Sequence, residues 1–276
     1  MTMKTPFVVA LVGTLTLCNA NAASTAPTDA AVCSSSSDGG ARVGACTRLI
    51  RQGGLGTPGR ASALYDRAVG YAKTGAVDLA IADYTEALHL KPDLAPALNN
   101  RGALYRSSGN PDRAIADFSA VIALEPGHVG AFVNRGIAYS DKGSYGSAIV
   151  DFGQAIRLAP DRAEGYSGRC WARALEGQEP EEALEDCNMA LRLQPDNSAA
   201  LGYRALALLR LNDFDSAIAD YDRCIASDPK NASFLYGRGI AKLRIGNITG
   251  ANEDLASAKS FNPRIAQAFA TFGVAP

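Results

Sequence analysis

The sequence predicts an all-α fold in the form of an elongated solenoid, and two observations indicate this class. Alanine is abundant, and alternating runs rich in Val, Ile and Thr, which are typical of strands, are scarce. Prolines recur at separations of 34 or 35 residues: Pro92, Pro126, Pro160, Pro195, Pro229 and Pro263. A period of this length is typical of repeats that stack on one another and bury a core only together.

The prolines divide most of the chain into six units. With each proline at position 32, the units are 61–94, 95–128, 129–162, 163–197, 198–231 and 232–265. The fourth unit has one extra residue, placed in the turn at 177–180 and left out of the position numbers. Position 8 always holds a small residue: Ala68, Gly102, Gly136, Cys170, Ala205 and Gly239. Position 20 is always alanine: Ala80, Ala114, Ala148, Ala183, Ala217 and Ala251. Antiparallel helices approach closely where both side chains are small, so each unit is predicted to be a helix–turn–helix that ends at its proline.

The segments Ala97–Gly102 and Ala148–Phe152 look like the two helices of one particular repeat, and the chain resembles tetratricopeptide-repeat (TPR) proteins. The resemblance covers all six units. It implies a right-handed superhelix of six helix-turn-helix repeats. It also implies a C-terminal capping helix in residues 266–276, where Ala268 and Phe269 supply apolar side chains.

Residues 1–22 have the features of a signal peptide. Lys4 supplies a positive charge, Phe7–Leu17 is apolar, and Ala20–Ala22 is a small-residue cleavage site. The apolar stretch is about eleven residues, shorter than the roughly 20 that span a bilayer. Lipid attachment at Cys18 is disfavoured because the bulky Leu17 precedes it. We therefore expect an exported protein without an integral membrane span.

Residues 23–60 are predicted to be a low-complexity linker. They are rich in Ser, Gly, Ala, Thr and Pro, and most of the segment buries too little apolar surface to offset its chain entropy. Apolar residues at helical spacing indicate a possible short helix at 41–52.

Every unit contains an arginine at position 7 and an aspartate at position 23. The arginines are Arg67, Arg101, Arg135, Arg169, Arg204 and Arg238, and the aspartates are Asp83, Asp117, Asp151, Asp186, Asp220 and Asp254. Two interpretations are open: a ladder that binds a ligand, or a repeated ion pair between packed helices. The ion pair is favoured because a binding site would vary along the groove.

Five cysteines follow the signal segment. Cys170 and Cys187 take positions 8 and 24 of one unit, and they are either buried thiols or a disulfide, which export favours. A second bridge between Cys33 and Cys46 would pin the N-terminal segment, and Cys224 is left over as a free thiol.

The fourth unit and the N-terminal segment also resemble a subgroup of exported bacterial TPR proteins. The resemblance lies in Arg169–Ala174, Ala183–Asn188 and Ala45–Ile50. It implies a periplasmic, disulfide-containing helical scaffold, supports both cysteine pairings, and implies no catalytic activity.

The resemblance places positions 5, 9, 12 and 13 of each first helix on the concave face. This groove would contain Tyr65, Lys73, Asn99, Arg106, Val133, Ser140, Asp141, Ser167, Trp171, Arg210, Tyr236 and Arg244. Its mixture of polar and aromatic side chains suits an extended peptide or a partner helix. Asn134 and Asn99 partly match the pattern of a carboxylate clamp, but its lysines are absent. Any single residue here could simply be a solvated side chain, so the prediction concerns the groove as a whole.

Three functional classes are considered. The leading one is a non-catalytic scaffold or adaptor that binds a protein or peptide, and the second is a structural or assembly component of an envelope complex. An enzyme is disfavoured because the only histidines, His89 and His128, have no paired nucleophile, and no phosphate loop is present. No cofactor or metal is expected, and the net charge of −1 disfavours a nucleic-acid partner. The oligomeric state stays open.

Overall fold

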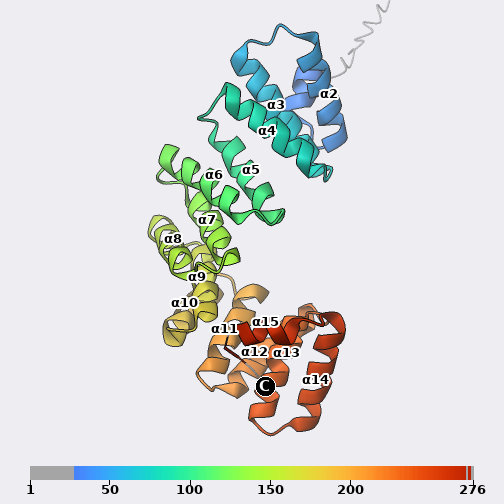
Figure 1. Ribbon diagram of the computed structural model, residues 1–276. Coiled ribbons are helices and arrows are strands. Elements are labelled where there is room, and N and C mark those ends of the chain that lie inside the picture. The colour runs from blue at the N-terminus through green and yellow to red at the C-terminus, as the bar shows by residue number, and fades with distance from the viewer. Residues whose placement is uncertain (1–27, 272, 275–276) are drawn as a thin grey trace, which may run out of the picture.

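The computed structural model describes residues 28–271, 273 and 274, which form fifteen helices and no strand. Figure 1 shows these helices following one another along a curved arc. In chain order the helices are α1 Asp29–Ser35, α2 Gly39–Gln52, α3 Thr57–Lys73, α4 Val77–Leu90, α5 Ala95–Ser107, α6 Pro111–Leu124, α7 Val129–Asp141, α8 Tyr145–Leu158, α9 Ala163–Glu176, α10 Pro180–Leu193, α11 Ser198–Arg210, α12 Phe214–Ser227, α13 Ala232–Arg244, α14 Ile248–Phe261 and α15 Ile265–Thr271.

The prediction of an all-helical solenoid is confirmed. Each sequence unit contributes one helix pair, from α3 with α4 to α13 with α14, and each second helix also packs against the first helix of the next unit. From α5 to α13 the first helices of successive units contact one another as well. The first helices therefore lie on the inner side of the arc, where α5, α7, α9 and α11 follow one another in Figure 1.

Small residues at position 8 are required by the ring that faces them. A Cβ atom on Gly102 would lie 2.9 Å from Cε1 of Phe118, and one on Gly136 would lie 2.9 Å from Cε1 of Phe152. Both phenylalanine side chains are fully buried. A small residue on one helix facing a large one on the other lets the two helices of these units approach closely.

We expect Gly136→Leu to lower the free energy of unfolding by roughly 1–3 kcal/mol, because the new side chain overpacks the contact with Phe152. Thermal or urea denaturation of the two proteins measures this effect. Gly127→Leu is the matched control, since nothing lies within 4 Å of a Cβ at that exposed turn. Equal stability of Gly136→Leu and the unaltered chain would contradict the packing described here.

The arginine and aspartate of each unit form a bidentate ion pair between the two helices. In all six units Nε and Nη2 of the arginine donate to the two carboxylate oxygens over 2.6–2.9 Å. The six aspartates are only 3–6% exposed. Hydrogen bonding to Asp117 raises the pKa of Arg101, as each partner does for its arginine.

The same arginines also connect neighbouring units. Nη1 of Arg101 donates to Oγ1 of Thr85 over 3.0 Å, and Nη1 of Arg135 donates to Oγ of Ser119 over 3.0 Å. Arg204 and Arg238 make the equivalent bond to the preceding unit. These four guanidinium groups therefore hold their own helix pair together and bind it to the preceding pair, which supports the structural interpretation of this ladder.

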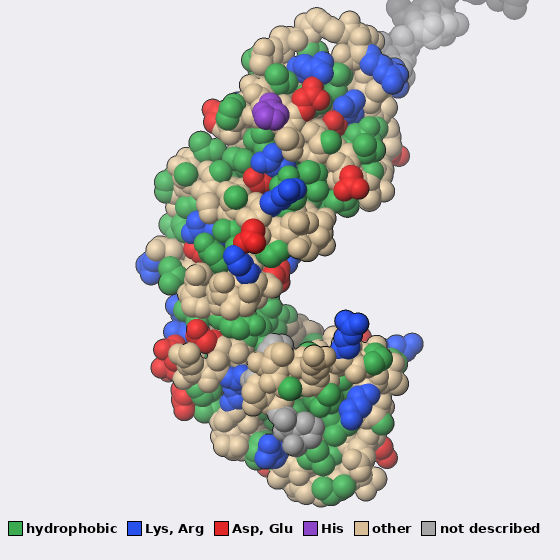
Figure 2. Space-filling view, in the orientation of Figure 1, with side chains coloured by type: hydrophobic (Ala, Val, Ile, Leu, Met, Phe, Trp, Pro, Cys, Tyr) green, Lys and Arg blue, Asp and Glu red, His purple; other side chains and the backbone are tan. Residues whose placement is uncertain are grey.

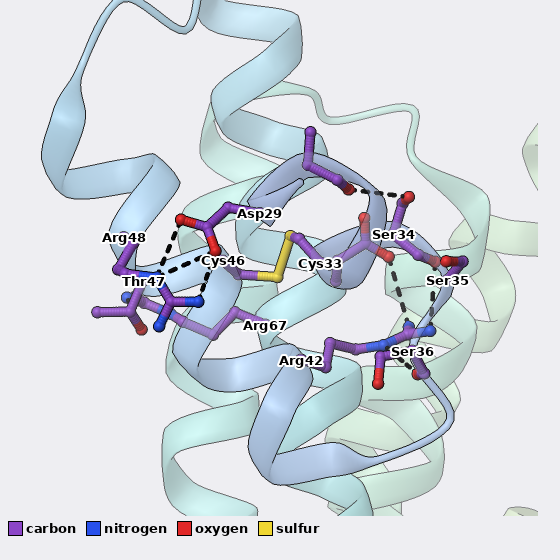
Figure 3. Close-up of a disulfide and its surroundings, with 12 residues drawn as sticks. Asp29, Cys33, Ser34, Ser35, Ser36, Arg42, Cys46, Thr47, Arg48 and Arg67 are labelled. Carbon is purple, nitrogen blue, oxygen red and sulfur yellow. Dashed lines mark hydrogen bonds and ion pairs between the residues drawn. A yellow bond between two sulfur atoms is a disulfide. The ribbon is translucent and has the colours of Figure 1, made fainter. Parts of the chain in front are cut away.

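The prediction of a linker at 23–60 is wrong for the part of the segment that the structure describes. Residues 29–35 and 39–52 form α1 and α2, and the possible helix at 41–52 lies within α2. Figure 3 shows why the serine run is ordered: Nε of Arg42 donates to the carbonyl oxygen of Ser36 over 3.0 Å, and Nη2 donates to that of Ser34 over 3.2 Å. The Cys33–Cys46 disulfide then joins the two helices.

The α1–α2 hairpin acts as an incomplete unit at the N-terminal end of the solenoid. Arg67 donates to Oγ1 of Thr47 over 3.4 Å, as Arg101 does to Thr85. Thr47 and Thr85 are 38 residues apart because α3 has 17 residues where α5 has 13, which adds one helical turn. The hairpin therefore stacks like a repeat although it does not follow the 34-residue period.

The C-terminal end is covered by α15, which overlaps the capping helix predicted at 266–276 and begins one residue earlier. Phe269 packs its ring against that of Tyr236, with a centroid separation of 4.9 Å, and Ile265 is also buried. The predicted signal peptide, residues 1–22, lies outside the described residues. Within the part that is described, no helix is both long and apolar enough to span a bilayer.

Candidate functional site

The candidate site is the concave face of the solenoid. Figure 2 shows a deep hollow between the part of the molecule that contains α3–α6 and the part that contains α11–α15. The first helices line this side of the arc in Figure 1. Their inward side chains are therefore the ones that a partner seated in the hollow would touch.

The structure brings several of the predicted groove residues into direct contact. Arg106 and Asp141 form an ion pair with an Nη1–Oδ2 distance of 3.2 Å, and both side chains are more than one third exposed. Nδ2 of Asn134 donates to Oδ1 of Asn99 over 3.1 Å. This bond links the two amides across neighbouring first helices, at positions that partly match a carboxylate clamp whose lysines the sequence lacks.

Other predicted residues bind backbone carbonyl groups or pack against another ring. Lys73 donates to the backbone carbonyl oxygen of Ser37. The hydroxyl of Ser167 donates to the backbone carbonyl oxygen of Glu164. Tyr65 packs against the ring of Tyr84 with a centroid separation of 5.8 Å.

Two of the predicted groove residues do not line an open surface. Ser140 is 4% exposed, and its hydroxyl donates to the carbonyl oxygen of Gly136 one turn earlier. Tyr236 is 2% exposed because α15 covers it with Phe269. A partner cannot reach either side chain without displacing a helix.

The centre of the concave face is a stacked pair of rings. Trp171 on α9 and Tyr203 on α11 lie with their centroids 5.9 Å apart and their planes inclined by 23°. Burial raises the pKa of Tyr203. The prediction included Trp171 but not Tyr203. In its unit Tyr203 takes position 6, where the units on either side carry Gly168 and Gly237, whose lack of a side chain makes room for the rings of Phe152 and Tyr221.

The stacked pair separates two chambers of similar size. The N-terminal chamber has a volume of about 400 Å³ and is lined by Arg106, Val133, Ile137, Phe152, Glu164, Ser167, Gly168, Trp171, Asn197, Ala199 and Tyr203. The C-terminal chamber has a volume of about 390 Å³ and is lined by Trp171, Leu175, Ala199, Gly202, Tyr203, Leu206, Tyr221, Asn231, Ser233, Phe234 and Phe269. Both chambers share Trp171, Ala199 and Tyr203, so they form one continuous groove.

The last two predicted residues, Arg210 and Arg244, lie further towards the C-terminal end. They line a third hollow of about 260 Å³ together with Gly273 and Val274, which follow α15. Burial lowers the pKa of Arg210. The chain's own C-terminal segment thus occupies this part of the concave face, and the open groove is centred on Trp171.

A disulfide lies directly behind this groove. Cys170, the residue before Trp171, is joined to Cys187 on α10, with a Cα–Cα distance of 5.3 Å. Both cysteines are fully buried. In the other units the space at positions 8 and 24 is filled by a ring or a leucine against a small residue, so here a covalent bond replaces that packing and fixes α9.

We expect thiol titration of the denatured, unreduced protein, processed after residue 22, to find one free thiol. That thiol is Cys224, which is buried and forms no disulfide. Burial raises the pKa of Cys224 to about 11, so in the folded protein the thiol stays protonated at neutral pH and unreactive. A count of five free thiols would show that neither disulfide forms.

The described residues contain no group of three or more His, Cys, Asp or Glu side chains arranged to hold a metal ion. The concave face offers aromatic stacking at Trp171 and Tyr203 and apolar surface in both chambers.

Comparisons with known proteins agree with this architecture. Three family models described as tetratricopeptide repeat match residues 95–128, 129–162, 172–232 and 204–264, which together make up more than half of the chain. A comparison with curated proteins found no match by sequence.

Solved structures match over most of the chain. A tetratricopeptide repeat protein from Parabacteroides merdae ATCC 43184 has a TM-score of 0.67 at 20% identity, over 86% of this chain and 93% of that one. Pseudomonas aeruginosa pilF has a TM-score of 0.60 at 18% identity, over 79% and 96%. YrrB, described as a TPR protein with an unusual peptide-binding site, has a TM-score of 0.50 at 21% identity, over 69% and 98%. With the matched repeats and the helical solenoid, these likenesses show that the chain belongs to the tetratricopeptide-repeat family.

Proposed function

We propose that this protein is a non-catalytic interaction scaffold that binds a peptide or helix of a partner protein in its concave groove. The observation that carries the proposal is the Trp171–Tyr203 stack, which stands between two chambers that open on the inner face. Aromatic side chains in concave, mostly apolar surroundings are the usual anchors of protein recognition.

Two further points support this function. The TPR family typically consists of non-catalytic repeat scaffolds, and YrrB, one of the similar folds, is described as having a peptide-binding site. The inner helices are also held rigidly by the arginine ladder, which limits the entropy that a partner's binding would cost.

We further propose that the protein works outside the cytoplasm, in the periplasm of a bacterium. Two disulfides join buried cysteines in the described chain, and disulfides persist mainly in oxidising compartments. The signal-peptide pattern of residues 1–22 agrees with this location.

A second candidate function is assembly through the outer surface of the solenoid. Val150 on α8 and Leu79 on α4 are 62% and 53% exposed on second helices, so the outer surface also offers apolar side chains. They stand on different units, however, and neither lines one of the two chambers on the concave face. The groove is therefore the favoured contact surface.

Affinity capture from an envelope extract of the native host tests the groove. Three baits are compared: the unaltered chain, Trp171→Ala and Phe261→Ala. Phe261→Ala is the control because it removes a ring that is 48% exposed and lines neither chamber. We expect the unaltered chain and Phe261→Ala to recover the same protein, and Trp171→Ala to recover at least ten-fold less of it. Equal recovery by all three baits would contradict binding in the groove.

A further inference from the structure

We propose that a hollow on the outer side of the solenoid, between its third and fourth units, binds a small molecule that carries one carboxylate group. The carboxylate accepts a hydrogen bond from Arg169 and completes a bond between units that the arginine ladder lacks at this place. The site is separate from the concave groove, and the inference does not rest on what the groove binds.

The fourth arginine of the ladder lacks the contact that the other five make with the preceding helix pair. Their Nη1 atoms donate over 2.6–3.4 Å to the polar side chains of Thr47, Thr85, Ser119, Asn188 and Asp222. The residue at the equivalent place before Arg169 is Gly153, which has no side chain to accept a bond. Among the residues that the structure describes, Arg169 donates only to Asp186, through Nε and Nη2. Its Nη1 is therefore left as a donor without an acceptor in the described chain.

The space for the missing acceptor is open. A Cβ atom on Gly153 would meet only Nη1 of Arg169, at 3.7 Å, which is an ordinary van der Waals distance. The Arg169 side chain is 25% exposed, more than the other five ladder arginines at 17–24%. It lines a hollow of about 350 Å³. Sites for small molecules have volumes of roughly 300–1,000 Å³, so the hollow has the size of a ligand site.

A change at position 11 also uncovers this arginine. In the first three units this position holds a tyrosine whose ring lies 5.7–5.9 Å from the guanidinium carbon of the ladder arginine: Tyr71, Tyr105 and Tyr139. The fourth unit has Arg173 there instead, and its Nη1 donates to Oδ2 of Asp186 over 2.7 Å. Two guanidinium groups, those of Arg169 and Arg173, therefore share the single carboxylate of Asp186.

The other donors of the hollow also lack anionic partners. Arg192 is exposed, and its Nη2 lies 3.4 Å from the thioether sulfur of Met189, which is a weak acceptor. In the part of the chain that the structure describes, Arg192 forms no ion pair with a carboxylate. Oδ1 of Asn188 accepts from Arg204, so the amide N–H groups of Asn188 remain as donors. Guanidinium and amide donors around one hollow suit an oxygen anion.

The charges of the hollow favour a single carboxylate. A carboxylate already fills the equivalent place in the sixth unit, where Oδ1 of Asp222 accepts from Nη1 of Arg238 over 2.6 Å. Glu185 also lines the hollow, is exposed, and has no ion-pair partner among the described side chains. Its negative charge repels an anion, and the repulsion is twice as large for a dianion. The hollow therefore favours a monocarboxylate over an ion such as sulfate.

The lining of the hollow is more suited to a small polar molecule than to a protein surface. Five of its seven lining residues are charged or carry an amide, whereas the centres of protein interfaces are depleted of charged residues. None of the seven lines either chamber of the concave face.

Titration with acetate tests the inference. Proton–nitrogen correlation spectra of the arginine side chains follow the Nε–H signal of Arg169, while sulfate and chloride at equal ionic strength serve as comparison anions. We expect acetate to shift this signal in a saturable way, sulfate to bind more weakly, and chloride to cause no saturable shift.

Gly153→Asp is the decisive variant because it places a carboxylate of the chain itself beside Arg169. A side chain meets no obstacle at this position, so the melting temperature should not fall. We expect the Arg169 signal to lie near its acetate-saturated position before any acetate is added, and acetate to bind at least ten-fold more weakly. Gly153→Ser, which copies Ser119 at the preceding place, should act in the same direction.

Ala256→Asp is the matched control. Ala256 takes the same position of the sixth unit, where it is exposed and no further unit follows, so this variant should bind acetate like the unaltered chain. Glu185→Gln removes the opposing charge and should tighten acetate binding at least two-fold.

The inference is overturned if acetate does not shift the Arg169 signal, if chloride shifts it equally, or if sulfate binds more tightly than acetate. It is equally overturned if Gly153→Asp responds to acetate like Ala256→Asp, or if Glu185→Gln weakens binding. Capture of a protein partner through Trp171 depends on none of these results, so the proposed function and this site can fail separately.

Discussion

Asp151→Ala is expected to lower the free energy of unfolding by about 3–5 kcal/mol, because it leaves the guanidinium of Arg135 without its carboxylate between two packed helices. Nε and Nη2 of Arg135 each donate to Asp151 over 2.7 Å, and Asp151 is 3% exposed. Arg135 also bonds to Ser119 in the preceding unit, so the loss affects the stacking of two units. Urea denaturation followed by circular dichroism measures the change.

The exposed ion pair of the groove provides the control. Asp141→Ala removes a carboxylate from a pair in which both side chains are more than one third exposed, and such pairs contribute about 0–1 kcal/mol. If Asp151→Ala were no more destabilising than Asp141→Ala, the arginine ladder would not hold the units together.

Replacement of both Cys170 and Cys187 by alanine is the second change with a large expected effect. Removal of a native disulfide costs about 2–5 kcal/mol, and here it also leaves position 24 of the fourth unit without a large side chain. We expect a lower melting temperature, and a shift in the emission of Trp171 because the adjoining helix loses its fixed position. Reduction of the unaltered protein breaks this bond together with Cys33–Cys46 and should likewise lower the melting temperature.

A rescue variant separates loss of the bond from loss of packing. Cys170→Ala with Cys187→Phe recreates the arrangement of the first and fifth units, where Ala68 faces Tyr84 and Ala205 faces Tyr221. Burial of the phenylalanine ring should recover about 1.5–3 kcal/mol relative to the double alanine variant. A variant less stable than the double alanine form would show that the fourth unit is not built like the others.

The repeat architecture could be predicted from the sequence because the contacts that define it lie between residues close together in the chain. Three features of the sequence reflect contacts within one unit. They are a glycine that faces a ring, such as Gly136 opposite Phe152, an alanine at each helix crossing, and a proline after each second helix. The period then extends these contacts along the chain. The Arg135–Asp151 pair was likewise visible as a constant spacing of two charges.

The N-terminal hairpin was predicted only in part, as a possible helix at 41–52 and a Cys33–Cys46 bridge, because its evidence is not periodic. The extra turn of α3 moves Thr47 38 residues from its counterpart Thr85, so the segment falls out of the 34-residue register. Its order depends on the Cys33–Cys46 bond and on Arg42, which holds the carbonyl groups of the serine run. The composition of the segment shows the run of serines, but it does not show that Arg42 binds their carbonyl groups.

The candidate site could be predicted only in part for a similar reason. Trp171 was found because its helical position faces inwards, whereas Tyr203 and the two chambers depend on how neighbouring units rotate against each other. Tyr236 also faces inwards, but the returning helix α15 buries it. The position of a residue within its repeat predicts which way its side chain points. The packing of neighbouring repeats determines whether that side chain is exposed.

Site-specific photocrosslinking in the native host tests the central claim most directly. A photoreactive amino acid is placed either at Ala199, in the groove, or at Val150, which is 62% exposed on the second helix of the third unit. Binding in the groove predicts one protein crosslinked from position 199 and not from position 150, with the crosslink lost in a Trp171→Ala background. A partner crosslinked from position 150 and not from position 199 would contradict it and favour assembly through the outer surface.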